Sequence, residues 1–197
     1  MVELIEGRDA IWDTEKYDVV MVGTNINNSL RSGFQSKMRM KYPHIAVANN
    51  ATDYGNTIKL GKRLTIDGDP IISLLYITRS HKFRGRSTLD YDALENCLVT
   101  ANAEFRGKRV MTTLIGCSRF DGYGDRERVL DMLYRYCTDI DLYVYDYDQL
   151  NIEDEAIAVF DKIVALKGVD NEKYKTLWSD RFNILRSLYL DIRRVRY

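Results

Sequence analysis

From residue 1 to about residue 148, the chain alternates between two patterns of apolar positions. Short, mostly apolar runs predict buried strands, and between them apolar residues recur every three or four positions, as on one face of a helix. The runs that predict strands are 2–5, 17–23, 57–60, 63–66, 71–78, 109–115 and 140–146. Helices are predicted at 34–42, at 88–105 with Thr88 as N-cap, and at 125–137, while 44–51 is either a helical turn or irregular. Strands that alternate with helices predict an α/β domain built on a central sheet.

After Asp148 the pattern changes to two helical segments, 153–167 and 172–194, joined by a polar link at 168–171. Apolar positions in both segments keep the spacing of an amphipathic helix. We therefore expect two parts, an α/β domain at 1–149 and a two-helix extension at 150–197. The extension either docks on the α/β body as a helical hairpin or serves as an arm for a protein partner or a homodimer.

Composition excludes some classes of function. Lysine plus arginine number 29, as do aspartate plus glutamate, so bulk charge gives no argument for nucleic acid or an anionic membrane. The three cysteines lack metal-ligand spacing, and Cys97 and Cys137 lie in apolar helical contexts typical of buried thiols. We expect no metal site and a reducing, cytoplasmic location. The start is acidic, unlike a signal peptide, and no run approaches membrane-spanning length.

Candidate chemistry lies first in the segment 114–125, between the predicted strand 109–115 and the predicted helix 125–137. The segment contains Gly116, Gly122 and Gly124. Glycines let the backbone turn tightly and approach a ligand, and a helix start offers N–H groups and the positive end of its dipole. A strand, a glycine loop and a helix start together favour phosphate binding. An ordinary strand-to-helix turn is the alternative.

A similar loop follows the predicted strand 17–23. It contains Asn25, Asn27 and Asn28, and Gly33 precedes the next predicted helix. Asparagine tolerates left-handed backbone and bonds to neighbouring amides, so both turn chemistry and ligand binding fit this composition. Two such loops at the carboxyl edge of one sheet would form a cleft, where ligands bind in open α/β folds. The basic segment 79–86 is either a solvated linker or a rim that attracts an anionic ligand.

Together, these segments resemble a macrodomain, the fold that binds ADP-ribose and related NAD metabolites. The resemblance covers about residues 2–149 and rests on 19–25, 32–43, 114–124 and 144–146. The middle segment, 76–98, is similar to the branch that contains the terminal ADP-ribose glycohydrolases and bacterial antitoxin macrodomains. The resemblance implies a macrodomain-like three-layer α/β/α fold with a central mixed sheet, to which this chain adds the C-terminal helical hairpin.

The resemblance also implies ligand contacts. Asn25 would contact the distal ribose and Tyr145 would pack on the adenine. Asp9, displaced by one residue from the family's position, would read the adenine amino group. The other implied contacts lie in the two loops and are Gly33, Phe34, Gly116, Cys117, Ser118, Arg119, Phe120 and Gly122. Ser118 stands where the hydrolytic branch has a glycine, and the second loop is longer than in that branch.

The resemblance to the hydrolytic branch implies catalytic candidates. There, a lysine from the helix after the first loop can attack the anomeric carbon, and an aspartate of the second loop assists proton transfer. Lys37 and Lys41 are the lysine candidates here, and Asp121 is the aspartate candidate. An amine must lose its proton before it attacks, and an aspartate beside the sugar can act as acid or base. Exposed helix charges at the lysines and a turn residue at Asp121 are the alternatives.

Two functions of different classes therefore fit the sequence. The first is binding of ADP-ribose or a related NAD-derived nucleotide, with hydrolysis of an ADP-ribosyl linkage as its enzymatic form. The second is a non-catalytic nucleotide reader or a partner-binding module that acts through residues 150–197. The expected ligand is a small nucleotide or an ADP-ribosylated macromolecule, with no required cofactor and no membrane.

Overall fold

A six-stranded sheet forms the centre of the computed structural model, which describes residues 1–7, 9–31, 33–79, 88–117, 122 and 124–146. The strands lie in the order β1-β6-β5-β2-β4-β3. Their bounds are Val2–Glu6 for β1, Val19–Asn25 for β2, Arg63–Ile66 for β3, Ile71–Thr78 for β4, Arg109–Thr113 for β5 and Asp141–Asp146 for β6. All neighbours pair in parallel except β3, which pairs antiparallel with β4. The sheet is therefore mixed, as expected.

The strand β2 is buried along its whole length in the middle of the sheet. A nearly continuous apolar run of this kind is typical of a parallel strand that is covered on both faces. Val19 and Met21 belong to one hydrophobic cluster, while Val20 and Val22 belong to another. Since successive side chains of a strand point to opposite faces, the two clusters lie on opposite sides of the sheet.

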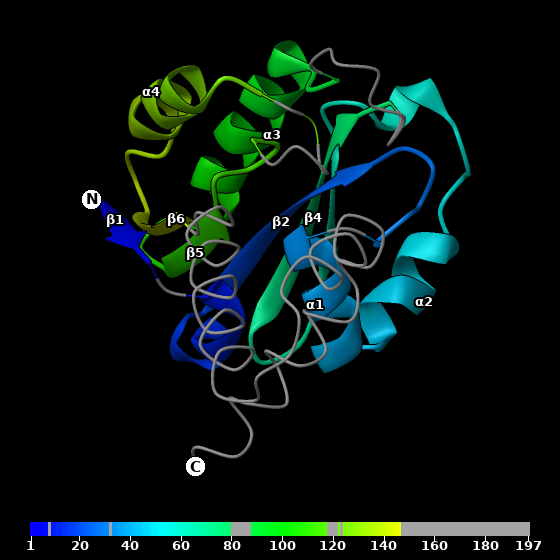
Figure 1. The fold of residues 1–197 in the computed structure, drawn as a ribbon, viewed down its shortest axis with the longest axis horizontal. Helices are drawn as coiled ribbons and strands as arrows, with labels where there is room; N and C mark the ends of the chain where they lie inside the picture. Colours follow the sequence, from blue (N-terminus) through cyan, green and yellow to red (C-terminus); the bar gives the residue numbers. More distant parts are fainter. Residues whose placement is uncertain (8, 32, 80–87, 118–121, 123, 147–197) are drawn as a thin grey trace, which may run out of the picture. The chain divides into compact units, whose positions relative to one another are not determined.

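Helices cover both faces of the sheet (Figure 1). One face carries α3 (Tyr91–Glu104) and α4 (Arg126–Tyr136), and the other carries α1 (Gly33–Lys41) and α2 (His44–Asn50). The three-layer α/β/α arrangement is confirmed. The predicted C-terminal helices at 150–197 lie outside the described residues.

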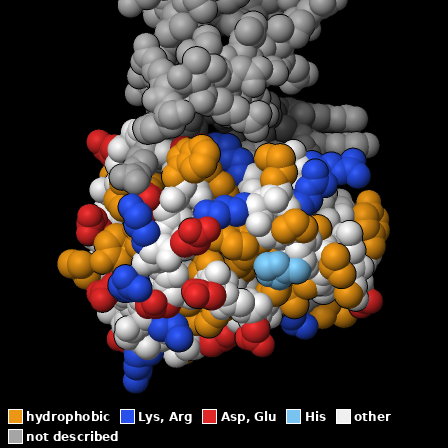
Figure 2. Space-filling model, turned by 90° about the horizontal axis from the view of Figure 1, so that it is seen from below, with side chains coloured by type: hydrophobic (Ala, Val, Ile, Leu, Met, Phe, Trp, Pro, Cys, Tyr) orange, Lys and Arg blue, Asp and Glu red, His pale blue; other side chains and the backbone are white. Residues whose placement is uncertain are grey.

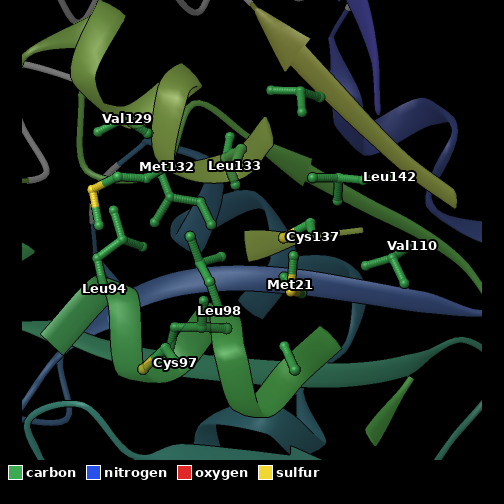
Figure 3. Packing of buried hydrophobic residues seen from close by; sticks show 14 of the residues in the cluster. Met21, Leu94, Cys97, Leu98, Val110, Val129, Met132, Leu133, Cys137 and Leu142 are labelled. Carbon is green, nitrogen blue, oxygen red and sulfur yellow. The ribbon is translucent and has the colours of Figure 1, made fainter. Parts of the chain in front are cut away.

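The cluster under α3 and α4 joins these helices to the sheet (Figure 3). Leu94 and Leu98 of α3 and Leu133 of α4 have no exposed surface. They pack with Met21 and Leu142 of the sheet in the same cluster. Burial of such side chains supplies the main favourable free energy of folding.

Two local predictions are wrong, and in both places a side-chain cap decides the structure. The pattern at 57–60 predicts a strand, but Thr57–Lys59 forms a 3-10 helix. The side chain of Asn56 accepts a hydrogen bond from the backbone N–H of Ile58 and starts this turn. The helix α3 is capped by Asp90 rather than Thr88, since Asp90 Oδ1 accepts from the backbone N–H of Ala93 at 3.0 Å. The ambiguous segment 44–51 contains the helix α2.

Basic and acidic side chains are interspersed on the face shown in Figure 2. This mixture agrees with the balanced composition of the chain. Among the residues described, no helix combines the length and the apolar character needed to span a bilayer.

We predict that Leu98→Ala lowers the free energy of unfolding by about 2–5 kcal/mol, because it leaves a cavity between α3 and the sheet. The neighbouring Val99 is 48% exposed, so Val99→Ala is the matched control and should change this free energy by less than about 0.5 kcal/mol. Urea unfolding of both variants measures the difference. Equal effects of the two substitutions would contradict the placement of α3.

Candidate functional site

The two loops singled out in the sequence leave the same edge of the sheet. They follow β2 and β5, which are adjacent and parallel, with Val19 paired to Val110. The carboxyl ends of both strands therefore face the same way. Ligands of open α/β folds bind at this edge. The strands that carry the two loops are therefore neighbours, and the cleft between the loops stays a prediction.

Asn25 ends β2 and shapes the first loop, residues 26–31. Its side chain is buried and donates from Nδ2 to the carbonyl of Ser29 at 2.7 Å. Its Oδ1 accepts from the backbone N–H groups of Asn27 and Ser29 at 3.0 and 3.3 Å. These bonds are the turn chemistry that the sequence also predicts for this loop, as the alternative to ligand binding. The predicted contact of Asn25 with a ribose stays a prediction.

The first loop is also held by distant segments of the chain. The backbone N–H of Ile26 donates to the carbonyl of Thr78 at the end of β4, at 3.1 Å. The side chain of Asn27 donates to the carbonyl of Arg79 at 3.2 Å. Lys59, which the sequence patterns did not single out, donates from Nζ to the carbonyl of Ile26 at 3.2 Å and is only 9% exposed.

A backbone hydrogen bond between two glycines closes the base of the second loop. The N–H of Gly124 donates to the carbonyl of Gly116 at 2.8 Å. Gly116 and Gly122 have φ angles of +72° and +150°, and a Cβ on Gly122 would lie 2.7 Å from the carbonyl oxygen of Gly116. Side chains at these two positions would clash or be strained. Closure of the loop base is therefore sufficient reason for these glycines, whether or not a ligand approaches them.

Four predicted site residues of the second loop lie outside the described residues. They are Ser118, Arg119, Phe120 and the catalytic candidate Asp121.

The start of α4 differs from the expectation of an open helix N-terminus. Asp125 is the N-cap, and its Oδ1 accepts from the backbone N–H of Arg128 at 2.8 Å. The backbone N–H of Asp125 donates to the hydroxyl of Tyr91 at 2.8 Å. A carboxylate at this cap satisfies one helix N–H group and opposes the approach of a second anion. A phosphate at this edge would thus depend more on backbone amides of the loop than on α4.

Two predicted site residues, Asp9 and Lys37, meet in an ion pair. Lys37 Nζ donates to Asp9 Oδ2, and the side chains are 24% and 15% exposed. The other oxygen of Asp9 accepts from the backbone N–H of Ile11 at 3.2 Å, which starts a 3-10 turn at Ala10–Trp12. The pair joins α1 to the segment after β1. An ammonium held in this way must transfer a proton before it can act as a nucleophile.

Lys41 lies one turn further along α1 and anchors the N-terminal segment. Its Nζ donates to the carbonyl of Ile11 at 3.2 Å and to Oγ1 of Thr14 at 2.9 Å. It also lies 3.1 Å from a carboxylate oxygen of Glu15. Among the described residues, Lys37 contacts another predicted site residue, Asp9, and Lys41 does not.

Tyr145 lies in the core at the end of β6. Its ring is 2% exposed, and its hydroxyl donates to Oδ2 of Asp13 at 2.8 Å. The hydroxyl is also 2.9 Å from that of Tyr17. Burial and these hydrogen bonds raise the pKa of Tyr145. These bonds connect β6 to the N-terminal segment. Because Tyr145 is buried, an adenine could pack on its ring only if the ring became exposed.

The remaining predicted contacts lie at the bases of the two loops. Gly33 begins α1 with a φ of +47°, and Phe34 is partly buried against the cluster under α1 and α2. Cys117 is partly exposed at the base of the second loop. In the part of the chain that the structure describes, no group of three or more His, Cys, Asp or Glu side chains is placed to hold a metal ion.

Neither a protein-family model nor a curated protein matches the sequence. Solved structures do match. The macrodomain of Mycobacterium tuberculosis DarG is 18% identical, with a TM-score of 0.55 over 74% of this chain and 97% of that chain. Thermosipho africanus DarTG in complex with ADP-ribose is 15% identical, with a TM-score of 0.56 over 73% of this chain and 41% of that chain. A Trypanosoma brucei macrodomain in complex with ADP-ribose is 11% identical, with a TM-score of 0.51 over 76% and 65%.

These matches are similarities of fold. The chain has the macrodomain fold, as the sequence motifs implied.

We predict that Cys117 reacts with a thiol reagent in the native protein at about pH 8 while Cys97 and Cys137 do not. Cys97 and Cys137 are 0% and 1% exposed, and burial raises the pKa of each thiol to about 12. Labelling followed by mass spectrometry identifies the modified residue, and Cys117→Ser should remove the fast reaction. Fast native labelling of either buried cysteine would contradict the packing of α3 and α4.

Proposed function

We propose that this chain uses its macrodomain fold to bind ADP-ribose or a related NAD-derived nucleotide at the carboxyl edge of β2 and β5. The observation that carries the proposal is the pairing of these two strands, which sends two tightly built loops to one edge of the sheet. Two structures of the same fold, from Thermosipho africanus and Trypanosoma brucei, are complexes with ADP-ribose. They are 15% and 11% identical to this chain.

The loops have different parts in this proposal. The second loop would hold the diphosphate through backbone N–H groups between Gly116 and Gly124, since successive amides in a turn form an anion-binding concavity. The first loop would receive the distal ribose. Asn25 would act there by holding the loop in shape, because its own polar atoms bond to the backbone of Asn27 and Ser29.

Hydrolysis of an ADP-ribosyl linkage is the enzymatic form of the proposal. After passing its proton to Asp9, Lys37 would attack the anomeric carbon through Nζ, and the bond to the leaving group would break. Asp121 would donate the proton that the leaving group takes up. Water would then add to the anomeric carbon as its bond to Nζ breaks; Asp121 would take up the proton that the water loses, and Asp9 would return its proton to Lys37. The geometric support is the contact between Lys37 and Asp9. In this role Asp9 would lie beside the anomeric carbon, so it would not also read the adenine amino group. Asp121 lies outside the described residues.

The alternative is a non-catalytic reader, or a module that binds a protein partner or a second copy through residues 150–197. The described residues contain nothing that favours the partner-binding role over the nucleotide site.

We predict that ADP-ribose at about 100 times its Kd stabilises the protein by about 2.7 kcal/mol, which raises Tm by about 5–10 °C for a domain of this size. The same ligand should slow the labelling of Cys117, which lies at the base of the second loop. Cys97, labelled after denaturation, is the internal control. A Tm and a labelling rate that ADP-ribose leaves unchanged would exclude the proposed ligand.

We predict that Lys37→Met and Asp121→Asn each slow the release of ADP-ribose from a mono-ADP-ribosylated protein by about 100-fold or more, because each removes a group that bonds to reacting atoms. Lys41→Met tests the second lysine candidate on α1, and it should lower Tm while leaving kcat nearly unchanged, since Lys41 anchors Ile11 and Thr14. Single-turnover assays with labelled substrate measure release. Turnover that persists in the Lys37→Met/Asp121→Asn double variant would remove this mechanism, and no turnover in the wild type with intact binding would favour a reader.

A further inference from the structure

We propose that Lys59 is the positioning residue of the first loop and holds it in the shape that the distal part of ADP-ribose requires. The inference deepens the proposed function and rests on it. Lys59 ends the 3-10 turn Thr57–Lys59, far along the chain from β2.

The ammonium group of Lys59 joins the loop to the segment that follows α2. Its Nζ donates to the carbonyl of Ile26 and to Oδ1 of Asn28, which lie 33 and 31 residues earlier in the sequence. It also contacts Oγ1 of Thr52 at 2.8 Å and the carbonyl of Asp53 at 3.0 Å. Four oxygens thus surround a group with three N–H donors, so each N–H of the ammonium has an acceptor within the protein.

Asn28 has left-handed backbone, which asparagine tolerates better than most other residues. Its φ of 54° is the only positive value at a non-glycine position among the described residues. Left-handed backbone is uncommon outside glycine and persists where the surroundings fix it. The side chain of Asn28 accepts from Lys59 and donates to the carbonyl of Thr52 at 2.8 Å. The N–H of Gly55 donates to the carbonyl of Ile26 at 2.9 Å, which adds a further bond between the loop and the segment that follows α2.

The groups that accept hydrogen bonds from the Lys59 ammonium are uncharged. Its side chain is 9% exposed, and Nζ lies 4.3 Å from the centre of the Tyr76 ring. Within the described ranges it makes no salt bridge, and Asp53 contacts it through the backbone carbonyl. Burial lowers the pKa of Lys59, an effect that the charge of Asp53 opposes.

Burying a cation without a carboxylate partner costs free energy. A hydrophobic side chain of similar length would fill the space without that cost. The cation is therefore better explained by its contacts with the loop, and its positive potential beneath the loop also favours an anionic ligand.

The test compares Lys59→Met with Lys62→Met. Both replace an ammonium with an unbranched apolar side chain, and Lys62 is exposed three positions away. Hydrogen exchange of the backbone amides at 27–29 is measured in the free protein, and the Kd values of ADP-ribose and ADP are measured by calorimetry at a temperature where all variants are folded. ADP lacks the distal ribose, so the ratio of the two Kd values reports on the first loop rather than on global stability.

For Lys59→Met we expect loop amides to exchange about tenfold faster or more and the preference for ADP-ribose over ADP to fall by about tenfold. Lys62→Met should match the wild type in both measurements. Asn28→Gly is a second variant that keeps Lys59 and accepts the positive φ, but removes the side chain through which Lys59 holds the loop. It should reproduce both effects even where Lys59→Met is too unstable to study.

Unchanged loop exchange in Lys59→Met and Asn28→Gly would overturn the role of Lys59 in holding the loop. Faster exchange with an unchanged ratio of Kd values would overturn its role in ligand binding. If the wild type binds neither nucleotide, the proposed function fails, and the exchange measurement alone still decides whether Lys59 holds the loop.

Discussion

The burial of β2 on both faces is the constraint on which the rest of the structure depends. A strand in the middle of a sheet with helices on both sides must supply apolar side chains to both clusters, as Val19 and Met21 do on one side and Val20 and Val22 on the other. It pairs with β5 and β4, and the ends of these strands set where the loops begin. The candidate site is a consequence of this packing, because the first loop starts where Asn25 leaves the sheet.

Several polar side chains of this domain hold the protein's own backbone. Asn25 bonds to its loop, Asp125 caps α4, and Lys41 anchors the N-terminal segment. Such contacts make a site rigid before a ligand arrives, which lowers the entropy that binding must offset. A ligand would then meet mainly backbone groups and a few partly exposed side chains, among them the Lys37–Asp9 pair.

The sequence predicted the elements whose signal is hydrophobic periodicity. The strands β2, β4 and β6 and the helices α3 and α4 are long or strongly patterned, and the two loops between them followed from the order of elements. Short segments decided by one hydrogen bond were harder to predict. Residues 57–60 carry β-type side chains, yet the cap by Asn56 makes them a 3-10 turn. Lys59 was missed for the same reason, because its partners lie in segments that only the tertiary fold brings together. A lysine between Ile58 and Leu60 was the available signal, and it reads equally well as an exposed strand position.

A titration of the amide-labelled protein with ADP-ribose, followed by two-dimensional NMR, tests the central claim most directly. The account predicts that shifts concentrate at 26–31 and 114–117 and at the glycines that close the second loop, while amides of β3 and the far ends of α3 and α4 stay in place. An unchanged spectrum, or shifts confined to the opposite edge of the sheet, would contradict a nucleotide site between these two loops.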